Sequence, residues 1–277
     1  MKKTFIIFCF ITFILNIQFI SAQTASGFRG QSLSGATGLF SIPSGRIGWE
    51  DSSGFGFDAG YRAIMNDNEG VTHIPAITLS ILRWIELSAA FDIQPEINNG
   101  GNNDLLFGFK LKLPTNNTSV VIGGNIQLLN IANDNYSYNA YQPYIAVTYS
   151  GSFFSMKAET TLVFGKTIYS GGPRNNSNID FGMGFDLILF PDVFGDAVHW
   201  IIDFANFSYS DNSWPNHSYF HTSAVSRGIL NTGFRIDLSA FPALNKFKFL
   251  VDFIFNDLFD DGSRSFTIGG VFGYQFS

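Results

Sequence analysis

The chain has 277 residues, a formal net charge of −6, and side chains of which 17% are aromatic and only 14% are charged. This acidic, charge-poor composition gives no support to nucleic-acid binding, which requires a basic surface. The single cysteine excludes a framework of internal disulfides, and the 32 Phe, 10 Tyr and 4 Trp favour a protein in contact with lipid.

The first 22 residues have the three regions of a secretory signal. Lys2 and Lys3 precede an apolar run over residues 5–20, and small residues end at Ala22, where we predict cleavage. The run is shorter than the ~20 residues that a membrane-spanning helix needs. Cys9 lies inside this segment, so the mature chain is expected to have no cysteine and no acyl anchor on one. Removal of two of the 16 basic residues leaves 14 against 22 acidic ones, a mature net charge near −8.

Residues 23–52 are rich in glycine and show no regular alternation of apolar and polar side chains. This composition is a poor match to a β-strand, because glycine adds entropy cost and no packing surface. We predict either a periplasmic lead-in or a segment that plugs the mouth of the domain that follows.

From residue 53 to the end, the chain reads as short segments of alternating apolar and polar residues. Between 105 and 113, for example, Leu105, Phe107 and Phe109 share one face, whereas Gly108 and Lys110 share the other. We predict about twelve such strands, near residues 53–62, 74–82, 84–92, 105–113, 118–130, 140–150, 152–165, 179–189, 196–209, 230–239, 246–256 and 264–276. In the ninth predicted strand, the alternation of apolar and polar residues changes phase at Phe207, and a β-bulge would restore it.

The connections between these segments alternate between tight and long. Tight connections are expected near Leu82-Arg83, 113–118, Ser150-Gly-Ser152, 190–196 and 241–245. Longer, more polar connections are expected near 65–73, 94–103, 131–139, 166–178, 210–226 and 256–264. Bacterial barrels have short periplasmic turns and long external loops.

These patterns predict an all-β fold: a transmembrane antiparallel β-barrel of about 12 strands in an up-and-down meander. A soluble sandwich or barrel also alternates, but a soluble barrel turns its apolar side inward, and a sandwich of this size usually carries more charge. We therefore predict an outer-membrane location in a diderm bacterium, with both chain termini in the periplasm.

Charged residues on the polar faces are predicted to point into the lumen, because charge at membrane depth must face protein or water. There they either pair across strands and close the bore or line a narrow aqueous path. The candidates are Glu86, Lys110, Lys112, Lys157, Glu159, Asp180, Asp186, Asp203, Arg235, Asp237 and Asp252.

No catalytic, cofactor or metal site is predicted. His217 and His221 have serines nearby and the i, i+4 spacing of zinc ligands, but Pro215 and the absence of a carboxylate partner favour an exposed aromatic loop. Asp257, Asp260 and Asp261 lack the alternate-residue spacing of a calcium loop, so a solvated turn is the simpler interpretation.

The segment before the first strand carries a motif that can be compared with a known family. Its elements are a Gly-x-Thr-Gly-Leu, an apolar-Pro-small unit, an acidic residue and a Gly-Tyr strand, at Gly35, Thr37, Gly38, Leu39, Ile42, Pro43, Arg46, Asp51, Gly60 and Tyr61. About forty residues here resemble the opening of the YjbH family of outer-membrane proteins, which are linked to exopolysaccharide export. Unlike longer members, this chain has no lipoprotein cysteine and has room for only one barrel.

The functional prediction is a non-enzymatic barrel that serves as a passage, or an accessory to a passage, for a polar solute or exopolysaccharide. The alternatives are a lipid-modifying outer-membrane enzyme and a structural or surface-interaction barrel. Expected partners are outer-membrane lipid, the barrel-assembly machinery and a polysaccharide or small polar solute, with no nucleic acid and no cofactor.

Overall fold

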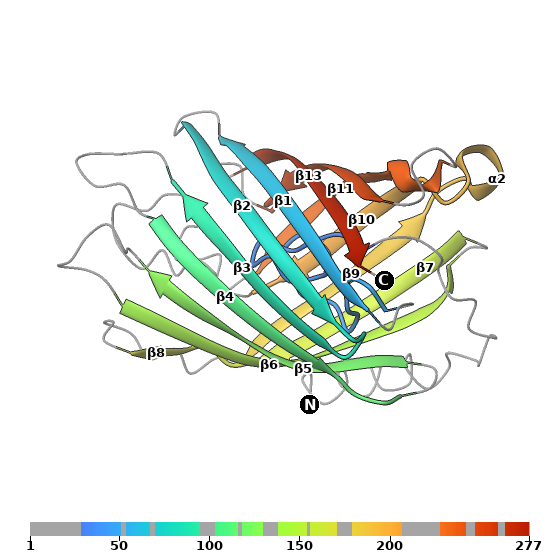
Figure 1. Ribbon diagram of the computed structural model, residues 1–277. Helices are drawn as coiled ribbons and strands as arrows, with labels where there is room; N and C mark the ends of the chain where they lie inside the picture. Colours follow the sequence, from blue (N-terminus) through green and yellow to red (C-terminus); the bar gives the residue numbers. More distant parts are fainter. Residues whose placement is uncertain are drawn as a thin grey trace, which may run out of the picture.

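The computed structural model describes residues 29–50, 54–66, 70–94, 103–115, 118–129, 138–153, 156–170, 179–206, 228–241, 247–259 and 264–276. Their strands form one antiparallel sheet that closes on itself, so the predicted fold class is confirmed (Figure 1). The strands are β1 (Phe55–Asn66), β2 (Gly70–Ile81), β3 (Ile85–Ile93), β4 (Asn103–Lys112), β5 (Thr118–Leu129), β6 (Tyr138–Phe153), β7 (Met156–Gly165), β8 (Ile168–Ser170), β9 (Asp180–Ile188), β10 (Val198–Ala205), β11 (Ile229–Asp237), β12 (Lys248–Asn256) and β13 (Ser265–Phe276).

Except for β8, each strand pairs with a neighbour in sequence, as expected for a meander, and the first strand pairs with the last. β1 and β13 are in register from Phe55 opposite Phe276 to Asn66 opposite Ser265. Around the other side, β5 pairs with β6 and completes the ring. Closure leaves the barrel without an open edge.

The thirteenth strand arises from a break in one long strand rather than from an additional crossing. β7 and β8 both pair with β6, and both follow a single register, since Tyr144 lies opposite Gly165 and Tyr141 lies opposite Ile168. The gap falls opposite Pro143, which has no backbone N–H to donate to the ladder. The Pro143 carbonyl still accepts from the Lys166 N–H at 3.1 Å. The barrel therefore has twelve crossings, whereas the sequence placed 168–170 in a loop.

Several predicted boundaries were wrong. The connection predicted over 65–73 shrinks to residues 67–69, because β1 and β2 continue their ladder to Asn66 opposite Gly70. The turn predicted at 150–152 lies further on, because β6 extends to Phe153.

Of two short helices, one occupies a connection that was predicted as a tight turn and the other replaces the end of a predicted strand. α2 (Pro191–Phe194) joins β9 to β10, with proline at its first position. β11 ends at Asp237 and not at residue 239, because the Asp237 side chain accepts from the Ser239 N–H and starts the 3₁₀ turn η1 (Leu238–Ala240). No helix within the described ranges is long and apolar enough to cross a membrane.

The two faces of the wall differ in chemistry. Large apolar side chains lie on the outside, among them Phe109 at 44% and Phe272 at 50% exposure. Polar and charged side chains lie on the inside, and Arg62, Lys110, Arg235 and Lys248 are among the most completely buried side chains of the described residues. The alternation seen in the sequence thus places apolar groups outward and polar groups inward, the reverse of a soluble barrel.

Aromatic pairs cluster on the outer surface near both ends of the barrel. At the end where the chain makes its tight turns, Phe247 stacks against Phe272 and lies beside Tyr274, with ring centroids 5.6 Å apart in both pairs. At the opposite end, which carries the longer connections, Phe255 and Phe266 approach to 5.1 Å. We refer to these as the tight-turn end and the long-loop end.

Candidate functional site

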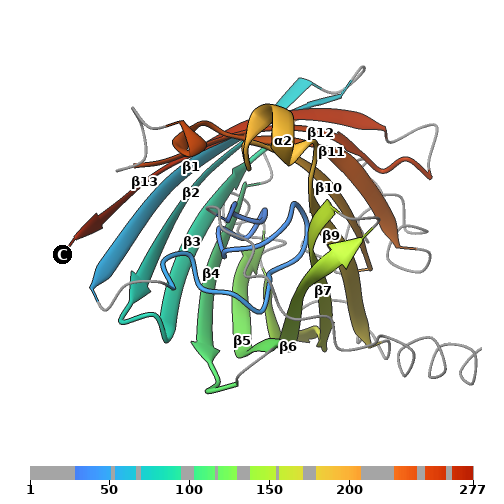
Figure 2. The ribbon, with the colours of Figure 1, turned by 90° about the vertical axis from the view of Figure 1, so that its right-hand side faces the viewer.

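The lumen is occupied by the segment before β1, residues 29–50, which we call the luminal segment. It runs inside the ring of strands as an irregular loop (Figure 2). Two isolated bridges, Gln31 to Thr37 and Gly38 to Pro43, give it some internal structure. Gln31, Ser32, Ser34, Thr37, Ile42 and Ile47 have no measurable exposure. The segment is therefore packed against the wall rather than suspended in it.

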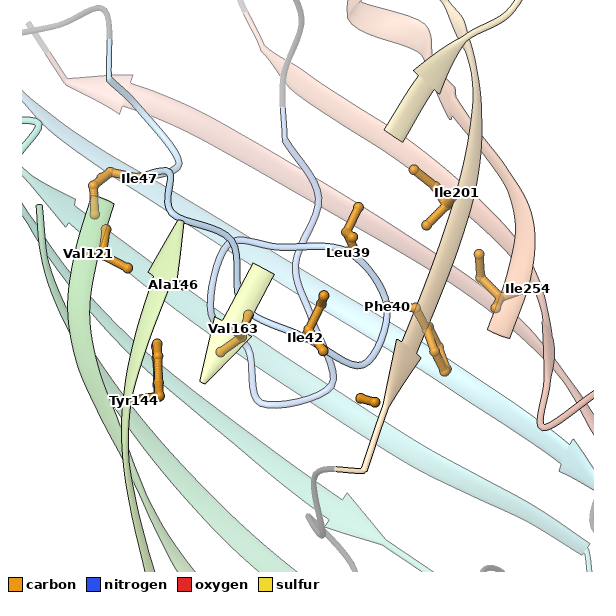
Figure 3. Packing of buried hydrophobic residues seen from close by; sticks show 11 residues of the cluster. Leu39, Phe40, Ile42, Ile47, Val121, Tyr144, Ala146, Val163, Ile201 and Ile254 are labelled. Carbon is orange, nitrogen blue, oxygen red and sulfur yellow. The ribbon is translucent and has the colours of Figure 1, made fainter. Parts of the chain in front are cut away.

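Apolar side chains of the luminal segment form a core with the wall (Figure 3). Leu39, Phe40 and Ile42 lie in one buried cluster with residues of the wall, and Ile47 lies beside the wall residue Val121. The wall contributes Val121, Tyr144, Ala146, Val163, Ile201, Ala205 and Ile254. Burial of these side chains favours docking by the hydrophobic effect, at ~25 cal/mol per Å² of apolar surface removed from water.

Two wall carboxylates hold the backbone of the luminal segment. Glu86 on β3 accepts from the Thr37 N–H at 2.8 Å, the Thr37 hydroxyl at 2.6 Å and the Gly48 N–H at 3.0 Å. On the other side of the barrel, Asp203 on β10 accepts from the N–H groups of Phe40 at 2.8 Å and Ser41 at 2.7 Å. Bonds of this kind to an ionised acceptor are roughly twice as strong as neutral ones.

Three basic side chains of the wall bind carbonyl oxygens of the same segment. Lys110, which pairs with Glu86 at 3.0 Å, donates to the carbonyls of residues 37, 44 and 46. Arg62 donates to the carbonyls of residues 31 and 32, and Arg235 donates to that of Gly38 at 3.3 Å. The charges on the wall thus satisfy backbone groups that no strand partner satisfies.

Close approach to the wall requires glycine at Gly45. A Cβ atom there would lie 2.4 Å from the Ser119 carbonyl oxygen and 2.7 Å from the Thr148 N. Instead, the Gly45 N–H donates to the Thr148 hydroxyl at 2.8 Å, and its carbonyl accepts from the Ser119 hydroxyl at 2.6 Å. Glycine at this position therefore reflects contact with the wall and not flexibility.

Both ends of the luminal segment meet at one carboxylate near the tight-turn end. Glu159 on β7 forms ion pairs of 3.0 Å with Arg29 at the start of the segment and with Arg46 near its end. Arg46 also pairs with Glu50 at 3.3 Å, and Glu50 pairs with Lys112 on β4 at 2.9 Å. We call these five residues the clasp.

The clasp sets the protonation of Glu50. Burial raises the pKa of its carboxyl group, but the nearby charges of Arg29, Arg46 and Lys112 outweigh this, so the pKa lies below the ordinary value of 4.5. The carboxylate stays ionised at neutral pH and keeps the clasp closed.

The other predicted lumen residues lie away from the luminal segment or bind it indirectly. Asp252 holds Arg235 through two hydrogen bonds of 2.7 and 3.0 Å. Asp186 contacts His199 at 2.6 Å, Asp180 accepts from Gln142 at 3.0 Å, and Lys157 pairs with Asp196 at 2.8 Å near the tight-turn end. Asp237 caps η1.

Some important wall residues were not singled out from the sequence. Asp58 on β1 accepts from the Trp49 indole N–H at 2.9 Å and pairs with Lys248 on β12 at 2.8 Å. The period-2 pattern already places Asp58 and Arg62 on the polar face of the first strand. The same criterion that selected the other lumen candidates could therefore have identified these two.

The catalytic and zinc alternatives rested on His217 and His221, which lie outside the described residues, as do Asp260, Asp261 and the predicted signal sequence. Within the part of the chain that is described, no group of three or more His, Cys, Asp or Glu side chains is arranged to hold a metal ion.

No protein-family model and no curated protein sequence matches the chain. Among solved structures, it is similar to the KdgM porin, with 11% identity over 79% of this chain and 99% of the other and a TM-score of 0.49. It is also similar to the outer membrane protein Omp33 of Acinetobacter baumannii (12% identity, 82% and 100% covered, TM-score 0.43) and to LpxR from Salmonella typhimurium (9%, 80% and 100%, TM-score 0.46). Because these identities and scores are low, the functional argument rests on the geometry of this chain.

Proposed function

We propose that the protein spans the outer membrane of a diderm bacterium, with its tight-turn end and both chain termini in the periplasm. The apolar outer face and the aromatic groups near both ends of the barrel support this, because lipid-facing barrels carry an apolar band between aromatic girdles. The alternation of tight turns with longer connections supports the orientation, since periplasmic turns are the short ones.

Within that location, the proposed function is a non-enzymatic passage for a polar solute that is closed at rest by the luminal segment. The observation that carries it is the use of the wall charges. Glu86, Lys110, Arg62 and Asp203 all bind the backbone of residues 29–50, and Glu86 and Lys110 do so in addition to the ion pair that joins them.

Displacement of the luminal segment would leave a wettable bore. The wall facing it carries acidic, basic and hydroxyl groups, including Ser119 and Thr148, and groups of this kind line aqueous pores. A barrel with a permanently closed lumen could carry buried apolar side chains at the same positions without loss of stability, because buried ion pairs rarely stabilise a protein more than well-packed apolar residues do.

The resemblance to the YjbH family bears on the class of solute. Seven of the ten matched residues lie in the luminal segment, at Gly35, Thr37, Gly38, Leu39, Ile42, Pro43 and Arg46. The resemblance therefore coincides with the part of the chain that closes the bore. This supports an exopolysaccharide as the solute, with the barrel as its passage or an accessory to it.

Conductance in planar bilayers tests the passage with full-length mature protein. The wild-type chain should show near-background current, and the double variant Glu86→Ala/Asp203→Ala, which lacks both carboxylate anchors, should show frequent open events. Asp192→Ala, at an exposed position in α2, is the matched control and should behave as wild type. A variant that lacks residues 29–50 but keeps both carboxylates should also conduct, and a peptide of residues 29–50 should suppress its current, whereas a scrambled peptide should not. Background current in a correctly folded double variant would remove the passage proposal.

A further inference from the structure

At the long-loop end of the lumen, two carboxylates face each other on adjacent strands. Asp92 on β3 lies directly opposite Asp104 on β4. Side chains at such positions have Cβ atoms ~4.5–5.5 Å apart, and like charges there are destabilising. Further along the same two strands, Glu86 lies opposite Lys110 and forms an ion pair. This strand pair thus neutralises a buried charge at one level and sets two carboxyl groups opposite each other at another.

Neutral side-chain amides donate to both carboxyl groups. The Gln127 amide donates to Asp104 Oδ2 at 3.3 Å, and the Gln94 side chain donates to Asp92. Within the described part of the chain, Asp92 forms no ion pair, and its buried Oδ1 atom has no hydrogen-bond partner.

A third oxygen-bearing side chain occupies a diagonal position on the same face. Thr72 on β2 is 4% exposed, and its hydroxyl also has no partner. Because His73 lies opposite Ile93, Thr72 is on the same lumen-facing side as Asp92 and diagonal to it. β2, β3 and β4 are neighbours in the wall (Figure 1). Three neighbouring strands therefore carry oxygen-bearing side chains on the lumen side at this end of the barrel.

We propose that Asp92, Asp104 and Thr72 form a binding site for Ca²⁺. The site offers only oxygen atoms, which is the donor set of hard cations, and Ca²⁺ accepts irregular geometry and completes its 6–8 ligands with water. A divalent cation removes the repulsion between the two carboxylates. With only two carboxylates, the affinity is expected near that of weak extracellular sites, ~10⁻⁴–10⁻³ M. Bound Ca²⁺ would join β2, β3 and β4 at the long-loop end.

Calcium titration calorimetry on the full mature chain in detergent tests the site. Asp104→Asn should bind about one equivalent less than wild type, because the affinity of a calcium site depends on the charge of its carboxylate ligands. The control Asp192→Asn should bind as many as wild type. As a second readout, the wild-type barrel should need a higher temperature to lose its compact gel migration in calcium chloride than in EDTA, and Asp104→Asn should show no such difference.

A shared proton between the two carboxylates is the competing explanation. In that case wild type and Asp104→Asn would bind equal amounts of calcium, and wild type would unfold at the same temperature with calcium as with EDTA; either result overturns the proposal. If Asp104→Asn fails to fold, Asp92→Asn and the comparison of wild type in calcium and EDTA give the same decision. The test is independent of conductance, since a barrel that binds calcium but never opens contradicts only the passage.

Discussion

Replacement of Glu86 by alanine should release the luminal segment from the wall. The change removes three hydrogen bonds to residues 37 and 48 and leaves Lys110 buried without its ion-pair partner. Removing one member of a buried ion pair costs ~3–5 kcal/mol. Lys110 keeps three carbonyl acceptors, so the lower value of ~3 kcal/mol applies. At ~1.4 kcal/mol per factor of ten, the undocked population should rise about 100-fold.

Thiol labelling measures that population directly. Ala36, which is 1% exposed, is changed to cysteine in the wild-type and the Glu86→Ala protein. Both are prepared as residues 23–277, which leaves out Cys9, the single cysteine of the sequence. When redocking is faster than the reaction, the rate with a polar maleimide follows the undocked fraction. The rate should therefore increase about 100-fold in Glu86→Ala and remain unchanged in Asp192→Ala. An increase of less than about threefold would show that the Glu86 carboxylate does not anchor the segment.

Three further predictions address the clasp and the wall. The folded pKa of Glu50 lies below 4.5, so the stability that its ionised carboxylate gives to the clasp is present above that pH and is lost as the pH falls through the folded pKa. Hydrogen exchange of residues 46–50 should therefore accelerate as the pH falls through this range. Glu50→Gln should abolish the pH dependence. Pro143→Ala should restore a ladder donor, seen as a new protected amide; free exchange at position 143 would contradict the account of the β7–β8 break. On the outer face, Phe109→Lys should destabilise the membrane-inserted barrel by ~2–4 kcal/mol, measured by denaturant titration in lipid. Phe153→Lys, at a strand end, should cost only ~0–1 kcal/mol. Equal costs would mean that the outer face does not contact hydrocarbon.

Most of the wall was predictable because its signal is local. A period of two residues fixes which side of each strand meets lipid, so Phe107 and Phe109 could be separated from Lys110 by sequence alone. Strand ends were less predictable, because they depend on pairing with another strand. β1 and β2 extend each other beyond their alternating cores, and β7 stops where the neighbouring strand supplies Pro143.

The contacts inside the lumen could not be predicted in the same way. The period identifies Glu86 and Asp203 as polar-face residues, but it does not identify their partners, which are N–H groups of residues 37, 40 and 41 far away in the chain. The luminal segment has no period, because its backbone groups bind wall side chains instead of a neighbouring strand. Its course becomes evident only once the ring of strands around it is known.

The closing of the ring between β1 and β13 has a consequence for the order of assembly. The luminal segment is synthesised before any strand, yet it is bound by Glu159, which lies 130 residues after Arg29, and by Arg235, which lies 197 residues after Gly38. Contacts so distant in sequence form late, because the intervening chain must first be ordered. A segment that emerges before every strand of the barrel is therefore among the last to find its place, and it must already lie between the two halves of the sheet when the final strand joins the first.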